Sequence, residues 1–167
     1  GRFVGIVDSS NKLYPDAMKI LSKYIKKDLS LDFVCGTVKK DGKLYGGFDR
    51  EKIMFKFNII PSSVVGFFIK RSSLKKVGYL NLKYKIQADY DLLYRMIIKH
   101  NLKGINSSGE EVFGDLGNSG FSKKHNFLKT LFNEIRIRND NGQNKFVLLY
   151  IIIGRSIRKF FNILFGL

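Results

Sequence analysis

Short apolar runs of the kind found in buried strands alternate along this chain with stretches whose apolar residues recur at helical spacing. We expect strands at Phe3–Val7, Asp32–Val38 and Val64–Ile69, with shorter ones at Leu44–Tyr45 and near Ile105. We expect helices from Pro15 to Lys27, from Asp49 to Phe57, over Arg71–Val77, from Asp89 to His100 and from Asn126 to Arg138. This alternation predicts an α/β fold. The stretch Ser107–Ser122, rich in Gly, Ser, Asn and acidic residues, predicts a loop.

The chain has enough apolar material for one folded domain. It has 167 residues, of which 44% are hydrophobic and 14% aromatic, so it can bury a substantial core. Its single cysteine, Cys35, cannot form an internal disulfide, which fits a reducing compartment, and its place in a strand pattern predicts a small core residue. No stretch reaches the roughly 20 apolar residues that a membrane-spanning helix needs.

The charge balance is strongly basic. The chain has 30 Lys and Arg against 14 Asp and Glu, a net charge of +16. Such a protein attracts anions such as nucleotide phosphates, acidic lipid surfaces or nucleic acid, although scattered lysines equally suit a solvated face. We expect no nucleic-acid binding, because the aromatic residues are interleaved with aliphatic ones in core-like patterns and form no exposed stacking platform.

One short segment contains the strongest candidates for catalytic residues. In Ala88–Arg95 two carboxylates, Asp89 and Asp91, open an amphipathic helix. Asp91 and Arg95 are four residues apart and are expected to pair along the helix surface. Asp89 would lie at or before the first turn, where the helix dipole favours an ionised carboxylate. A carboxylate held there beside a loop could act as a general base; the alternative is that Asp89 only caps the helix.

Five segments together resemble a known family. They are Phe3–Pro15, Phe67–Tyr79, Ala88–Arg95, Gly117–Ser122 and Glu134–Arg138. Their order and spacing resemble family-2 glycosyltransferases, inverting sugar-nucleotide enzymes with the GT-A fold. The resemblance makes them, in turn, the strand with the metal-binding acidic motif, the acceptor-side strand and short helix, the catalytic-base helix, the small-residue loop near the donor phosphates and the basic helix that follows.

The resemblance also implies how the chain is organised. Residues 1–140 would form an incomplete GT-A-like (Rossmann-related) domain, a mixed sheet flanked by helices. In the family a nucleotide-binding half precedes the acidic motif, and almost nothing precedes it here. We therefore expect the C-terminal portion of a transferase, either truncated or completed by a separate donor-binding half.

Specific roles follow from the same resemblance. Asp89 takes the position of the general base, and Asp91, besides pairing with Arg95, is a candidate acceptor contact. Cations that could hold the leaving diphosphate are Lys123, Lys124, Arg136 and Arg138, each of which could also be plain surface charge.

The metal-binding motif that the resemblance implies is incomplete in this chain. Asp8 keeps the acidic motif, but Ser10 and Asn11 stand where the family tends to have Asp. A hard cation such as Mg²⁺ or Mn²⁺ prefers carboxylate oxygens, so we expect weak binding of a divalent metal here. His125 is a second candidate ligand, since some family members use a late His; a lone His beside two lysines could equally face solvent.

Residues 141–167 are predicted to form an amphipathic helix of mixed basic and apolar character. It could lie in a membrane interface with Arg155, Arg158 and Lys159 on anionic headgroups, or it could pack on the domain core or on a partner. We expect a cytoplasmic protein, which under the first alternative lies peripherally at the inner face of the membrane.

The expected function is transfer of a sugar, with inversion, from a nucleotide-sugar donor to a glycan or lipid-linked acceptor, as in cell-envelope polysaccharide biosynthesis. Two alternatives remain open. One is a non-catalytic remnant or accessory domain that keeps only the acceptor-side fold. The other is a basic module that binds a membrane surface.

Overall fold

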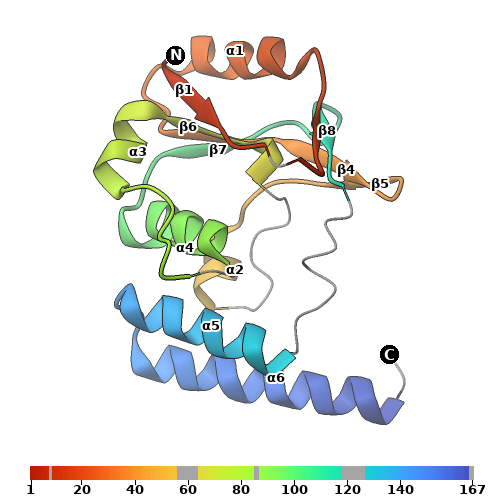
Figure 1. The fold of residues 1–167 in the computed structure, drawn as a ribbon, viewed down its shortest axis with the longest axis vertical. Coiled ribbons are helices and arrows are strands. Elements are labelled where there is room, and N and C mark those ends of the chain that lie inside the picture. The colour runs from red at the N-terminus through yellow and green to blue at the C-terminus, as the bar shows by residue number, and fades with distance from the viewer. Residues whose placement is uncertain (8, 56–63, 85–86, 118–126, 166–167) are drawn as a thin grey trace.

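The computed structural model describes residues 1–7, 9–55, 64–84, 87–117 and 127–165 (Figure 1). Two small β-sheets form the middle of the molecule, with helix α1 (Ala17–Lys27) along one side. The last two helices, α5 (Phe127–Asp140) and α6 (Lys145–Phe165), lie side by side at the end of the molecule farthest from α1. The fold is mixed α/β, as predicted.

The first sheet has the order β1-β6-β3-β7, formed by Phe3–Gly5, Phe67–Lys70, Phe33–Cys35 and Gly104–Asn106. Strand β6 runs antiparallel to both neighbours, while β3 and β7 are parallel. Strands β1, β3 and β7 therefore run in one direction, and their carboxyl ends meet at one edge. In open α/β sheets, ligands bind at that edge.

The second sheet has the order β2-β8-β4-β5, formed by Lys12–Leu13, Val112–Asp115, Thr37–Lys40 and Lys43–Tyr45. Strand β8 lies inside the stretch predicted to be a loop, so that prediction is wrong for residues 112–115. Phe113 explains the difference, because its side chain is fully buried and packs against Phe68. A long-range contact of this kind is invisible in the local Gly- and Ser-rich composition.

The single strand predicted over Asp32–Val38 is two strands in different sheets. The chain changes sheet at Gly36, whose amide donates to the carbonyl of Gly66 at 2.7 Å. A Cβ atom at Gly36 would lie 2.3 Å from the ring of Phe113. Only glycine fits at this crossing, and it lets the end of the first sheet continue directly into the second.

The predicted helices are confirmed with small shifts of their ends. They are α1, α2 (Arg50–Phe55), α3 (Arg71–Val77), α4 (Ala88–Tyr94) with its π-helical continuation η2 (Arg95–Lys99), and α5. A 3₁₀ turn, η1 (Val64–Gly66), precedes β6. Asp49 caps α2, since its carboxylate accepts the amide of Lys52 at 3.0 Å. No helix in the described part of the chain is long and apolar enough to cross a membrane.

Two clusters of apolar side chains hold these layers together. One joins the first sheet to α3 and α4, with Phe33 stacked on Phe67 at 5.0 Å and Met96 fully buried. The other lies between the sheets and α1 around Leu21 and Phe113. Each fully buried side chain of this size contributes roughly 1.5–3 kcal/mol of transfer free energy. The first cluster therefore fixes α4 on its sheet, and the second fixes α1.

Candidate functional site

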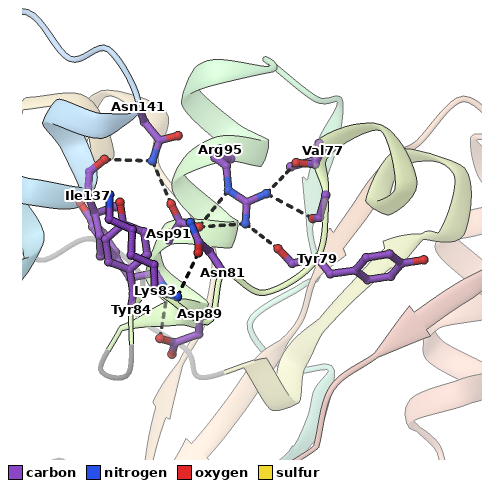
Figure 2. Close-up of polar contacts among 12 residues, drawn as sticks. Val77, Tyr79, Asn81, Lys83, Tyr84, Asp89, Asp91, Arg95, Ile137 and Asn141 are labelled. Carbon is purple, nitrogen blue, oxygen red and sulfur yellow. Dashed lines mark hydrogen bonds and ion pairs between the residues drawn. The ribbon is translucent and has the colours of Figure 1, made fainter.

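The predicted pair of Asp91 and Arg95 is present and buried (Figure 2). Arg95 Nε donates to Asp91 Oδ2 at 2.9 Å, and Nη2 of the same arginine lies 2.9 Å from that oxygen. The other oxygen, Oδ1, accepts the side-chain amide of Asn141 at 2.9 Å. The Asp91 side chain is only 2% exposed. With both oxygens bonded inside the fold, Asp91 joins α4 to the end of α5, and an acceptor contact has no exposed oxygen to use.

Arg95 extends this connection to the end of α3. Its Nη1 donates to the carbonyls of Val77 and Gly78 at 2.6 and 3.2 Å, and its Nη2 donates to the carbonyl of Tyr79 at 2.8 Å. The last carbonyls of a helix lack partners within that helix, so the guanidinium satisfies them. The pair therefore fixes α4 relative to the strand–helix unit β6–α3, which the resemblance assigns to the acceptor side.

Asp89 has a different environment from Asp91. It lies in the first turn of α4, is exposed, and its Oδ1 accepts the amide of Tyr90 at 2.9 Å. The residue at the N-cap position is Gln87, in a left-handed conformation with φ of 69°. Asp89 is therefore not the N-cap residue, but its carboxylate does satisfy one backbone amide of the first turn. Figure 2 shows the Asp89 carboxylate pointing away from the Asp91–Arg95 group.

The segment between α3 and α4 is hydrogen-bonded to Asp140, the last residue of α5. Lys83 Nζ and the Tyr84 hydroxyl both donate to Asp140 Oδ2, at 2.6 and 2.7 Å. These two donors hold the pKa of Asp140 below its usual range. Burial, and then the bond to Asp140, raises the pKa of Tyr84 well above that of a free tyrosine. The segment leading into α4 is thus attached at both ends, by Arg95 and by Asp140.

A second place of interest lies where the acidic-motif segment meets the small-residue loop. The amide of Gly117 donates to Asn11 Oδ1 at 3.0 Å, across 106 positions of sequence. A Cβ atom at Gly117 would lie 1.6 Å from the carbonyl oxygen of Ser10, so only glycine allows this approach. The Asn11 Nδ2 group is buried and has no hydrogen-bond partner among the described residues. It is a buried hydrogen-bond donor that no described group satisfies.

Asp115, which the sequence did not single out, lies beside this contact. It ends β8, pairs with Lys12 across the sheet, and accepts the Tyr14 hydroxyl at 2.5 Å. This bond raises the pKa of Tyr14. The signal was an acidic residue two positions after the apolar pair Val112–Phe113, which the loop prediction concealed.

The described residues do not by themselves make a metal site. Asn11 uses its oxygen on Gly117 and presents nitrogen, and Asp115 has one oxygen on Tyr14. No group of three or more His, Cys, Asp or Glu that could hold a metal occurs among them. The candidate ligands Asp8 and His125 lie outside the described residues, as do Lys123 and Lys124.

The two candidate arginines of α5 differ sharply. Arg138 is fully buried; its Nε donates to Glu134 at 3.3 Å, its Nη1 donates to the carbonyl of Met54 at 3.2 Å, and its guanidinium lies over the Tyr94 ring. It is a structural residue that ties α5 to α2 and α4, which corrects its predicted role as a diphosphate ligand. Arg136 is exposed and keeps that role as a prediction.

No protein-family model matches this chain, and no curated protein matches it.

Proposed function

We propose that this chain is a glycosyltransferase-like domain of incomplete GT-A type. It transfers a sugar with inversion from a nucleotide-sugar donor to a glycan or lipid-linked acceptor, with Asp89 as the general base. The observation that carries the proposal is the contact between Asn11 and Gly117, at 3.0 Å. It brings together two of the five segments on which the family resemblance rests, the acidic-motif segment and the loop expected near the donor phosphates.

The chemistry of that contact favours a phosphate over a cation. The Asn11 amide nitrogen is buried without a partner among the described residues, and a nitrogen donor binds an oxygen atom. Backbone amides of small-residue loops bind phosphate oxygens in the same way. We therefore assign the donor diphosphate to the Asn11–Gly117 side of the domain, next to the start of β2 and the end of β8 in the second sheet.

Asp89 would complete the reaction from the acceptor side. The base removes the proton of an acceptor hydroxyl, the oxygen attacks the anomeric carbon, and the bond to the nucleoside diphosphate breaks on the opposite face. A base of this kind must be exposed to the substrate and carried by a rigid element. Asp89 is exposed, and Arg95 and its partners fix the helix that carries it. Asp91 supplies rigidity and takes no part in proton transfer.

The test is release of nucleoside diphosphate from a panel of nucleotide sugars, with and without Mn²⁺, combined with calorimetric binding of nucleoside diphosphates. We expect binding that weakens at least tenfold in Asn11→Ala, because each lost hydrogen bond to a charged group is worth about 1.5–3 kcal/mol. Asn144→Ala, at an exposed asparagine before α6, is the matched control and should bind as wild type. Dependence on Mn²⁺ would support the predicted metal.

A non-catalytic acceptor-side module is the second candidate. The observation that favours it is the bond from the Tyr90 amide to Asp89, which occupies part of the lone-pair capacity of that carboxylate. Absence of both turnover and nucleoside diphosphate binding, in a chain that folds cooperatively, would establish this candidate and contradict the first.

A further inference from the structure

Helix α6 turns its apolar side away from the domain. Leu148 and Ile151, one turn apart, are its buried residues and pack toward the body of the protein. On the opposite side, apolar residues recur every three or four positions, and each is at least 50% exposed; they are Phe146, Leu149, Ile153, Ile157, Phe160 and Leu164. We call these six residues the outer face of α6. A water-soluble helix normally has the reverse orientation.

The side toward the body also has a polar anchor, in addition to Leu148 and Ile151. Arg155 donates to Glu134 of α5, which also pairs with Arg138 at 3.2 Å. Breaking such a buried network is costly, so the orientation of α6 is fixed by its charges and not by loose packing. Figure 1 shows α6 along the outside of α5, with no other element beyond it in the described structure. The outer face is therefore held outward by the fold itself.

The charges of α6 indicate what covers the outer face. Over Lys145–Phe165 the helix has four basic residues and no acidic residue, and Lys145, Arg158 and Lys159 are exposed. A second copy would bring a second set of cations against the first, in a chain that already carries a net charge of +16. A helix with an apolar face and exposed lysine and arginine side chains suits the interface of an anionic bilayer.

An apolar hollow lies at the amino end of the outer face. It has a volume of about 420 Å³ and is lined by Phe55 of α2 with Phe146, Val147 and Tyr150 of α6. Its lining is almost entirely hydrocarbon, so it fits an acyl chain better than a polar ligand. The hollow is continuous with the outer face through Phe146, which belongs to both.

From this placement we propose that the outer face of α6 docks the protein on an anionic lipid surface, with the helix lying parallel to the membrane. The proposal stands independently of the transferase function, since it uses no residue of the Asn11–Gly117 contact and none of the Asp89 helix. If both hold, docking would hold the domain at the surface where a lipid-linked acceptor resides.

The absence of Trp from the chain allows a direct test. In the full chain, Ile157→Trp places a single fluorophore on the outer face, and Leu82→Trp places one at a residue that is 88% exposed elsewhere. With vesicles of phosphatidylcholine containing about one third phosphatidylglycerol, a composition that creates the negative surface potential, the Ile157→Trp emission should shift to the blue. The Leu82→Trp emission should not shift. Pure phosphatidylcholine should give at least tenfold weaker binding.

Vesicle sedimentation of paired variants completes the test. The double variant Ile153→Glu with Phe160→Glu should lose at least tenfold in binding, whereas Leu29→Glu with Leu82→Glu, at exposed apolar residues off the helix, should bind as wild type. Because all four positions are exposed, circular dichroism should show unchanged folding. No blue shift, or equal binding of both double variants, would overturn the proposal. The proposal would also be overturned if the wild-type chain binds no vesicles but self-associates in sedimentation velocity, and if only Ile153→Glu with Phe160→Glu abolishes that self-association.

Discussion

Asn11 accepts a hydrogen bond from the backbone of Gly117, and this bond joins segments 106 residues apart at the edge of the sheets. The approach depends on the missing side chain, since a Cβ atom at Gly117 would lie 1.6 Å from the Ser10 carbonyl. The Asn11 side-chain nitrogen is the donor that we assign to a phosphate, and the bond from Gly117 fixes the orientation of that amide. This contact is therefore both a packing feature and the basis of the functional proposal.

Gly117→Ala should therefore separate the two segments. We expect a loss of about 1–3 kcal/mol in the free energy of unfolding, because backbone must move to relieve the clash, together with loss of nucleoside diphosphate binding. Urea denaturation and calorimetry measure the two effects. Gly109→Ala is the control, since nothing lies within 4 Å of a Cβ atom there. Unchanged binding by Gly117→Ala would contradict the assignment of the phosphate to this contact.

Asp91→Asn should damage stability. It leaves the Arg95 guanidinium in a buried setting without its counter-charge, and breaking a buried pair in this way costs about 3–5 kcal/mol. Urea unfolding should therefore show a lower midpoint. Asp89→Asn, at an exposed position, should change the unfolding free energy by less than about 0.5 kcal/mol. Equal stability of the two variants would show that the Asp91–Arg95 pair does not hold α4 in place.

The bonds to Asp140 should give a defined pH dependence. Lys83 and Tyr84 hold the pKa of Asp140 below its ordinary value of 3.8. A carboxyl with a lowered pKa in the folded state contributes stability above its unfolded pKa, and that contribution is lost as pH falls through the folded pKa. The free energy of unfolding of the wild type should thus exceed that of Asp140→Asn at pH 6 by about 0.5–1 kcal/mol. This difference should disappear as the pH falls below 3.8 and through the lowered pKa of Asp140. A gap that persists in acid would contradict this.

Elements with strong local signals were predictable from the sequence. The boundaries of α3 follow from the apolar spacing of Arg71–Val77 and from Gly78, which ends the helix at a φ of 90°. The pairing of Asp91 with Arg95 follows from their spacing on one helix face. Both depend on interactions within a few residues, which a sequence displays directly.

Features decided by distant contacts were not predictable. Strand β8 exists because Phe113 fills the space beside Gly36, and the break between β3 and β4 has the same cause. Arg138 has the same basic character in sequence as exposed Arg136, but Glu134, Met54 and two tyrosine rings surround it. The packing of α5 against α2 and α4 decides which of these two arginines is buried. The composition of α5 alone does not indicate that packing.

Asp89 is the residue on which the enzymatic proposal depends most. The most direct measurement compares nucleoside diphosphate release, in the presence of nucleotide sugar and acceptor glycans, by the wild-type chain and by Asp89→Asn. Loss of a general base predicts a fall in turnover of at least about a hundredfold, with the unfolding free energy and nucleoside diphosphate binding unchanged. Turnover of Asp89→Asn near the wild-type rate would contradict the assignment of Asp89 as the base.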